Sequence, residues 1–264
     1  MSEQLLTPSS GLSARTAGPA DSPLVVLTGG IGTDLHLWDA QVDALAGPFR
    51  LVAYDHPGHG SSPAPPPGAT VEDLGRQLLA LLDDAGAGRA HLVGLSLGGL
   101  VVQWVAANAP DRVDRLVLLC TDVSLPPAAR WNERAAQVRA HGTRSVAEHA
   151  SERWFAPAFA ADPSPPGRAQ LAALEACDDE GYARCCEVLA EADLSGRVAD
   201  VRAPTLVVAG AEDRALPVDR LAALAAALPD ARLEVLDGCG HLPPVEAPAR
   251  VADLLHAHLQ EGSR

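Results

Sequence analysis

Short apolar runs alternate along the chain with longer segments in which leucine recurs at helical spacing. The apolar runs span residues 24–27, 50–54, 91–94, 116–119, 206–209 and 233–236. The recurring leucines include Leu74, Leu78, Leu82, Leu221, Leu224 and Leu228. Runs of the first kind are typical of buried strands, and leucines three or four residues apart are typical of helices that bury one face. This alternation predicts an α/β fold, with a mostly parallel sheet and covering helices.

A stretch at residues 123–197 interrupts the alternation. It is expected to form several helices around the Pro-rich break at residues 162–167. We predict that it is a helical cap inserted into one α/β core, whose two parts span residues 1–122 and 198–264. The stretch holds most of the chain's aromatic side chains, which either fill the cap's own small core or line a pocket. These are Trp131, Trp154, Phe155, Phe159 and Tyr182.

The sequence Gly94-Leu95-Ser96-Leu97-Gly98-Gly99 ends one apolar run and opens a helical pattern. It matches the nucleophile elbow, in which a serine occupies a strained turn between a strand and a helix. Glycines are needed at Gly94 and Gly98 because side chains two residues from such a serine would collide with neighbouring backbone. We therefore predict that Ser96 is a nucleophile at the carboxyl end of the sheet.

A nucleophilic serine needs a histidine to accept its proton, and the histidine follows the last strand when the elbow is of this kind. His241, His256 and His258 meet that condition. His256 and His258 fall within a helical pattern, whereas His241 lies in a glycine-rich loop that lets the ring turn inward. We predict that His241 is the base.

The third member is an acid that holds the histidine tautomer and favours the imidazolium formed during reaction. Asp213 follows the apolar run at residues 206–209, in the place where the chain order requires it. Its neighbour Glu212 is one alternative. Asp122, which follows the preceding apolar run, is the other.

The tetrahedral intermediate of acyl transfer needs two backbone N–H donors. One is predicted at Leu97, the residue after the serine. The other is predicted at Ile31, in the loop Thr28-Gly29-Gly30-Ile31-Gly32 that follows the first apolar run. The glycines of this loop are also compatible with a tight connection that has no catalytic role.

Composition narrows the function classes. The net charge of −14 disfavours nucleic acid and anionic membranes as partners. The chain has no lysine, which excludes Schiff-base catalysis, pyridoxal phosphate attachment and a phosphate-loop NTPase. Its five cysteines have no paired ligand spacing and suggest neither a disulfide framework nor a zinc site. We expect no metal and no cofactor; the two histidines of the turn at residues 55–62 lack ligand partners at metal-binding spacing.

No apolar run reaches the roughly 18 residues of a membrane helix. The polar start at residues 1–4 lacks the layout of a secretion signal. We therefore expect a cytoplasmic protein that acts on a small-molecule ester or lactone. A homo-oligomer is compatible with the sequence.

The triad order, the glycine loop and the turn at residues 55–62 resemble the α/β hydrolases over nearly the whole chain. Residues 31–39 and the cap run at residues 181–194 are similar to the 3-oxoadipate enol-lactonases of aromatic catabolism, as is the cap pattern around Trp131, Arg134 and residues 153–155. This resemblance implies ring opening of a small enol-lactone carboxylate through an acyl-enzyme, in the β-ketoadipate pathway.

The chain differs from these lactonases at the pair Gly29 and Gly30, at Pro57, and at the pair Pro243 and Pro244. A related esterase or lactonase of specialised metabolism therefore stays open as an alternative. A homologue that binds a ligand without turning it over is a further one, because a fold does not fix a function.

An acidic protein needs a local cation to hold an anionic substrate. Trp131 and Arg134 are three residues apart and so share one face of a predicted cap helix. We predict that Trp131, Arg134 and Trp154 contact the substrate. The alternative is that Arg134 pairs with an acid such as Glu133 or only solvates the cap.

Overall fold

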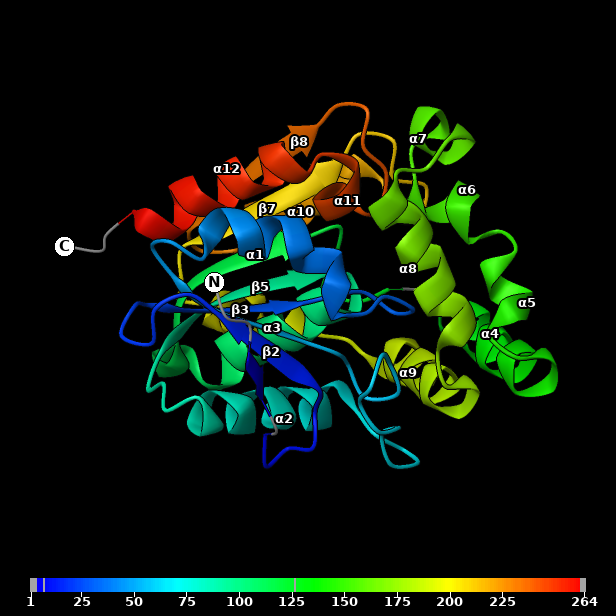
Figure 1. Ribbon diagram of the computed structural model, residues 1–264, viewed down its shortest axis with the longest axis horizontal. Helices are drawn as coiled ribbons and strands as arrows, with labels where there is room; N and C mark the ends of the chain where they lie inside the picture. Colours follow the sequence, from blue (N-terminus) through cyan, green and yellow to red (C-terminus); the bar gives the residue numbers. More distant parts are fainter. Residues whose placement is uncertain (1–3, 7, 126, 262–264) are drawn as a thin grey trace.

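An eight-stranded sheet forms the centre of the protein (Figure 1). The computed structural model describes residues 4–6, 8–125 and 127–261. In chain order the strands are β1 (Gln4–Leu6), β2 (Ala14–Ala17), β3 (Leu24–Thr28), β4 (Arg50–Tyr54), β5 (Ala90–Leu95), β6 (Val113–Leu119), β7 (Thr205–Gly210) and β8 (Ala231–Leu236). They lie side by side in the order β1-β2-β4-β3-β5-β6-β7-β8. Pairing is parallel from β4 through β8 in this order, and antiparallel for β1–β2 and β2–β4.

Each predicted apolar run lies within one of the parallel strands, which confirms the mostly parallel sheet. Every residue of β3, β5 and β7 is buried, because helices cover both faces of the sheet. The antiparallel strands β1 and β2 were not predicted. They are three and four residues long and contain no apolar run, so periodicity gives them no signal.

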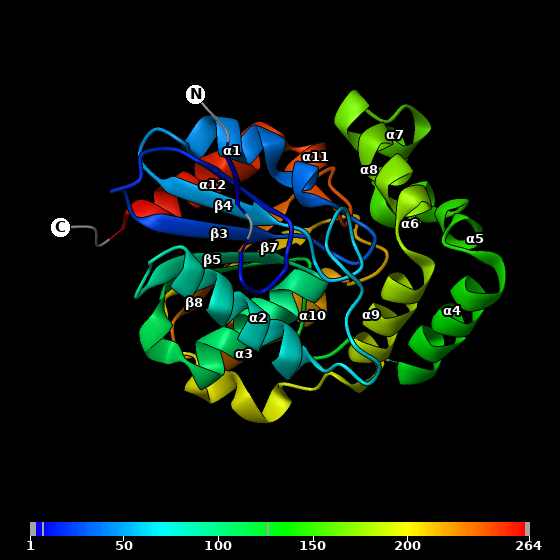
Figure 2. The ribbon, with the colours of Figure 1, turned by 60° about the horizontal axis from the view of Figure 1, so that its bottom comes forward.

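Helices cover the two faces of the sheet (Figures 1 and 2). On one face lie α1 (Asp39–Leu45) and α12 (Pro248–Gln260), which pack on each other. On the other lie α2 (Val71–Asp84) and α3 (Leu97–Asn108), and α10 (Val218–Ala227) packs against β7 and β8. The leucines that predicted α2 and α10 are buried, as the one-sided pattern requires. Short helical segments complete these connections: η1 (Leu35–Trp38), η2 (Pro110–Arg112), η3 (Ser195–Asp200) and α11 (Pro243–Glu246).

Among the described residues, six α-helices that follow β6 in the chain gather beyond one end of the sheet (Figures 1 and 2). They are α4 (Ala128–His141), α5 (Arg144–Ala147), α6 (Ala150–Trp154), α7 (Pro157–Ala161), α8 (Pro165–Ala176) and α9 (Asp179–Glu191). We call residues 128–191 the helical insertion. Phe155 and Tyr182 are buried in it, with α4 packed along α9. The predicted boundaries of the cap at residues 123 and 197 stay a prediction.

The turn at residues 55–62 is held by its own side chains and by β3. The Asp55 carboxylate accepts hydrogen bonds from the backbone N–H groups of Leu35 (2.7 Å) and Ser61 (3.0 Å). The His56 ring nitrogen Nε2 lies 2.9 Å from the Gly29 carbonyl oxygen and 2.9 Å from the Thr28 hydroxyl. These contacts give both polar residues structural partners, so the turn braces the loop that follows β3.

None of the described helices is both long enough and apolar enough to cross a membrane. Residues 1–3, on which the expectation about a secretion signal partly depends, lie outside the described part of the chain.

Candidate active site

Ser96 occupies a sharp turn between β5 and α3. Its backbone angles are φ 54° and ψ −113°, a region that a residue with a side chain rarely adopts. Two hydrogen bonds stabilise the turn: the Ser96 N–H donates to the Leu119 carbonyl (3.0 Å), and the Thr121 hydroxyl donates to the Ser96 carbonyl (2.8 Å). This geometry presents the Ser96 side chain at the carboxyl end of the parallel strands, as the motif predicts.

The two flanking glycines are sterically required. A Cβ atom on Gly94 would lie 2.4 Å from the Gly98 carbonyl oxygen, and one on Gly98 would lie 2.6 Å from the carbonyl oxygens of Thr28 and Gly29. Backbone cannot move aside at these distances as a flexible side chain can. The approach also brings the loop after β3 against the start of α3, where the Gly98 N–H donates to the Gly29 carbonyl at 3.0 Å.

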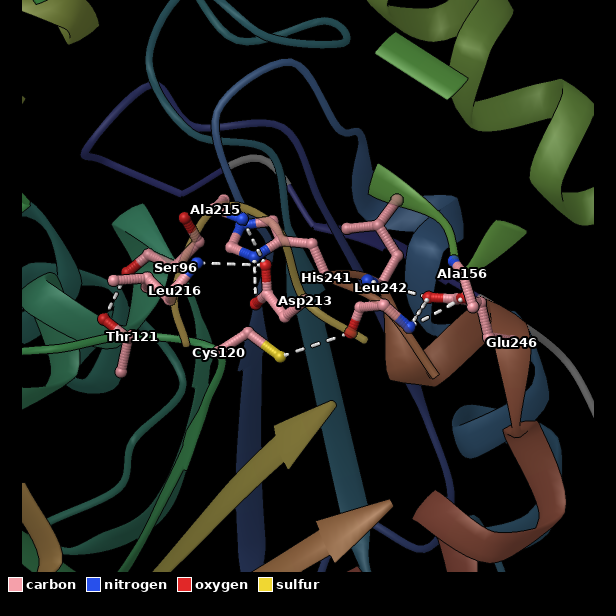
Figure 3. A network of polar contacts seen from close by, with 11 residues as sticks. Ser96, Cys120, Thr121, Ala156, Asp213, Ala215, Leu216, His241, Leu242 and Glu246 are labelled. Atoms are coloured by element: carbon pink, nitrogen blue, oxygen red, sulfur yellow. Dashed lines mark hydrogen bonds and ion pairs between the residues drawn. The ribbon is translucent and has the colours of Figure 1, made fainter. Parts of the chain in front are cut away.

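His241 and Asp213 form a buried hydrogen-bonded pair (Figure 3). The His241 nitrogen Nδ1 lies 2.7 Å from the Asp213 oxygen Oδ2. The other carboxylate oxygen accepts from the backbone N–H groups of Ala215 (2.7 Å) and Leu216 (3.1 Å), which fixes the acid in place. Since Nδ1 is committed to the carboxylate, Nε2 is the ring nitrogen left to act on a substrate.

The surroundings of the two residues favour protonated His241 beside ionised Asp213. Burial alone would lower the pKa of His241, but the Asp213 charge, their hydrogen bond and the Glu246 charge raise it above its usual value. Burial alone would raise the pKa of Asp213, but His241 and the two backbone N–H groups lower it below its usual value. The site is thus arranged to stabilise an imidazolium when His241 accepts a proton.

The sequence alternatives to these two residues have other partners. Asp122 binds Arg220, with 2.6 Å between the carboxylate and guanidinium atoms, and Glu212 is exposed. In α12, the His258 nitrogen Nε2 contacts the carbonyl oxygens of Leu116 (3.1 Å) and Pro204 (3.2 Å). His256 is exposed in the same helix and contacts Gln260.

The two predicted oxyanion donors come from the loop after β3 and from the start of α3. Ile31 lines the same pocket as Ser96, and Leu97 is the first residue of α3. Among the described residues, no hydrogen bond engages the backbone N–H of Ile31 or Leu97. Gly30 of this loop lies close to the serine, and an added Cβ would stand 3.3 Å from the Ser96 Cβ and 2.9 Å from Leu95 Cδ2. The glycine at this position therefore leaves room beside Ser96.

A pocket opens over Ser96 and His241, with walls from the core and from the helical insertion. The predicted contacts Trp131, Arg134 and Trp154 all line it. Arg134 lies over the Trp131 ring, 4.9 Å from the ring centroid, as expected for residues on one helix face. Within the described part of the chain Arg134 forms no ion pair with Glu133 or any other acid.

Two further arginines, Arg130 and Arg153, line the pocket, and none of the described Asp or Glu residues does. Burial lowers the pKa of Arg153, and the charges of Arg134 and Arg130 lower it further. Neither Arg130 nor Arg153 forms an ion pair within the described residues. The pocket therefore concentrates positive charge in a strongly acidic protein, which favours an anionic ligand.

Cys120, Asp213 and His241 are the described residues whose ligand atoms could meet at one metal ion, all within 4.8 Å of one another. Burial, followed by the Asp213 charge, raises the pKa of the Cys120 thiol well above its usual value. Metal binding needs the thiolate, so this environment disfavours it. The remaining four cysteines are likewise buried and free.

A model of the alpha/beta hydrolase family matches residues 25–254. The chain belongs to that family. This hydrolase is 35% identical to 3-oxoadipate enol-lactonase 2 of Acinetobacter baylyi, over 90% of the chain and 88% of the relative. It is 31% identical to a putative carbamate hydrolase of Pseudomonas savastanoi, over 87% of the chain and 90% of the relative. The crystal structure of the enol-lactonase from Burkholderia xenovorans superposes with a TM-score of 0.92 and 31% identity, covering 97% of this chain and 99% of that one.

Two features of the hydrolase's site were not predicted from sequence. Arg153 belongs to α6 and Arg130 to α4, so their shared pocket appears only when the helical insertion folds. Glu246 binds the loop that carries His241, yet its place in the sequence carries no motif that we could interpret. Only the adjacency of Arg153 to Trp154 gave a signal, through the cap pattern at residues 153–155.

Proposed function

We propose that this hydrolase opens a small enol-lactone carboxylate, of the 3-oxoadipate enol-lactone type, through an acyl-enzyme on Ser96. The observation that carries the proposal is the pocket itself. One cavity is lined by Ser96, His241 and three arginines and, within the described part of the chain, by no acidic side chain. A nucleophile and a cation cluster in one small cavity suit an acyl substrate that carries its own negative charge.

The proposed reaction begins when the Ser96 hydroxyl attacks the lactone carbonyl carbon and passes its proton to His241 Nε2. The backbone N–H groups of Ile31 and Leu97 stabilise the oxyanion, and Asp213 stabilises the imidazolium. The C–O bond of the ring then breaks, and His241 protonates the departing enol oxygen. Water, deprotonated by His241, cleaves the acyl-enzyme and releases the new carboxylic acid and Ser96.

The site offers a reason for a lactone in particular. In a lactone the departing enol stays attached to the acyl group, so the pocket must hold both ends of the opened chain. Arg134, stacked on Trp131, supplies a cation with its apolar support on the cap side of the cavity. Ser96 holds the acyl end on the core side, and the substrate carboxylate would lie between the arginines.

Carbamates form a second candidate substrate class, because a relative of comparable coverage is named a putative carbamate hydrolase. The same nucleophile and base would serve either substrate. The arginine cluster favours the substrate that retains a carboxylate distant from the cleaved bond.

The decisive experiment presents the purified protein with the enol-lactone of 3-oxoadipate and follows loss of its absorbance. In parallel, a fluorophosphonate probe should label Ser96 rapidly, because the probe reacts with an activated serine. Labelling without turnover of the lactone would favour the esterase or carbamate alternatives. Absence of labelling would favour a ligand-binding protein without catalysis.

The carboxylate contact is tested by Arg134→Met, which keeps an apolar side chain over Trp131. We expect kcat/KM for the lactone acid to fall. The lost transition-state stabilisation should be about 1.5 to 3 kcal/mol, the usual contribution of a hydrogen bond to a charged group. A methyl ester of the same lactone should lose much less. Steady-state kinetics on both substrates measure the difference.

Arg139→Met is the matched control, because Arg139 lies on the same helix but pairs with Glu180 (2.9 Å) and Glu187 (2.5 Å) outside the pocket. Its kcat/KM should stay near that of the natural protein. Equal losses for acid and ester in Arg134→Met would show that Arg134 supports packing of the helical insertion instead.

A further inference from the structure

Glu246, at the end of α11, binds backbone on both sides of His241 (Figure 3). Its carboxylate accepts hydrogen bonds from the N–H of Gly240, at 3.0 Å to each oxygen, and from the N–H of Leu242 at 3.2 Å. Both residues adjacent to His241 in the chain are therefore tied to one side chain. A carboxylate is suited to this role because it offers several acceptor sites and no donor when ionised.

The same carboxylate reaches the helical insertion. Its oxygen Oε2 accepts from the N–H of Ala156 at 2.8 Å, in the link between α6 and α7. Beside this contact, the His241 N–H donates to the Trp154 carbonyl at 2.7 Å. Gly240 packs so closely here that an added Cβ would lie 2.7 Å from the Ala156 nitrogen. The backbone of the His241 loop thus packs against residues 154–156, and Glu246 adds hydrogen bonds to both segments.

Trp154 of this segment also lines the pocket. One short segment would therefore meet the substrate through the Trp154 ring while its backbone holds the His241 loop. Glu246 does not line the pocket, so any effect it has on catalysis passes through His241 and this segment.

We propose that Glu246 is a positioning residue that locks the His241 loop to residues 154–156, so that the base is aligned with Ser96 only while the helical insertion is in place. The inference rests on the proposed function of Ser96 and His241. It adds a structural coupling between the wall that meets the substrate and the base that acts on it.

Charge gives the proposal a second observable consequence. The groups that face His241 are Asp213 from the loop after β7, Glu246 from α11, and Cys120 from the end of β6. Burial and the Asp213 charge raise the pKa of Glu246 above its usual value, although three backbone N–H groups oppose this shift. When Glu246 is ionised, its charge helps to raise the pKa of His241. Removal of that charge should lower the pKa of the base.

Glu246→Gln tests alignment and charge together, with p-nitrophenyl acetate as the probe substrate. The amide keeps the shape of the carboxylate but places an NH2 group against backbone N–H donors. We expect kcat and the rate of fluorophosphonate labelling of Ser96 to fall roughly 10- to 100-fold, as for a base displaced by about 1 Å. KM should change little, and the acidic limb of the pH profile should move to lower pH.

Glu246→Asp and Ala156→Pro separate alignment from charge. Aspartate keeps the charge but is one methylene too short to reach both partners. Proline at position 156 replaces the N–H that donates to Glu246 with a ring carbon, so it breaks this contact without changing any charge, and the Ala156 angle φ of −58° already suits proline. Both variants should lose kcat and labelling rate while the acidic limb stays in place.

Asp179→Asn is the matched control, because Asp179 likewise accepts a backbone N–H within the insertion, from Thr143 at 2.7 Å, but does not line the pocket. It should keep kcat and labelling rate. Glu246 variants that lower only the melting temperature, with kcat, labelling and pH profile unchanged, would overturn the proposal. Ester hydrolysis by Ser96→Ala would instead overturn the function of the site, so the two failures are distinguishable.

Discussion

Ser96→Ala is expected to abolish turnover while leaving the folded protein intact. The substitution removes the proposed nucleophile, and loss of a triad serine can lower kcat by about 10⁶, because the members of a triad act as a unit. The fold should survive because alanine, which also carries a Cβ atom, can adopt the same strained backbone angles as serine. The two flanking glycines also remain. Turnover of the lactone, thermal unfolding and fluorophosphonate labelling measure the three consequences.

Ser195→Ala is the control for this variant, because Ser195 lies in η3 and outside the pocket over Ser96. It should be labelled and active like the natural protein. Retention of more than a few per cent of activity by Ser96→Ala would show that the elbow does not supply the nucleophile. A large drop in its melting temperature would leave the loss of activity without a chemical interpretation, so unfolding must be measured first.

The parts of the fold that sequence predicts are those in which local pattern and tertiary contact agree. The inner parallel strands β3, β5 and β7 are buried on both faces, so their sequences are continuous apolar runs that can be recognised without knowledge of the neighbouring strand. The elbow can also be recognised in the sequence, because its geometry requires glycine at Gly94 and Gly98. A Cβ atom at either position would lie 2.4 to 2.6 Å from backbone atoms. His241 and Asp213 follow from chain order and from the loops in which they lie.

The parts that sequence does not predict depend on residues that are distant along the chain. The Glu246 carboxylate accepts a hydrogen bond from Ala156, which lies 90 residues away in the sequence, and the residues around neither one indicate the contact. The arginine cluster is of the same kind, since Arg153 comes from α6 and Arg134 from α4. The two short antiparallel strands β1 and β2 are not predicted for another reason. Their extended conformation depends on pairing with a neighbouring strand, and their own residues show no strand pattern.

Asp213→Asn is expected to keep the fold and to lower kcat by roughly 10⁴. In the natural protein the carboxylate accepts a hydrogen bond from the N–H at His241 Nδ1, with 2.7 Å between Nδ1 and Oδ2, and so leaves Nε2 unprotonated for its proposed role as acceptor of the Ser96 proton. An asparagine amide can donate to Nδ1 instead, which places the ring proton on Nε2, where it faces the serine and prevents its activation. Kinetics on p-nitrophenyl acetate give the magnitude without dependence on the lactone.

The pH profile gives an independent sign for the same variant. His241 must be neutral to act as a base, so activity is lost as pH falls through its pKa, which the protein raises above the usual 6.5. The acidic limb of the natural protein should therefore have its midpoint above pH 6.5. In Asp213→Asn the negative charge beside the ring is absent, so the midpoint should move to lower pH.

Asp122→Asn distinguishes the predicted acid from its alternative. Asp122 is held by Arg220 at 2.6 Å and accepts the Val123 N–H at 2.7 Å, so its carboxylate already has partners away from His241. We expect this variant to lose some stability and to keep both its kcat and the position of its acidic limb. A larger loss of kcat in Asp122→Asn than in Asp213→Asn would mean that the acid acts from the end of β6, and that the buried hydrogen bond between Asp213 and His241 only supports the loop.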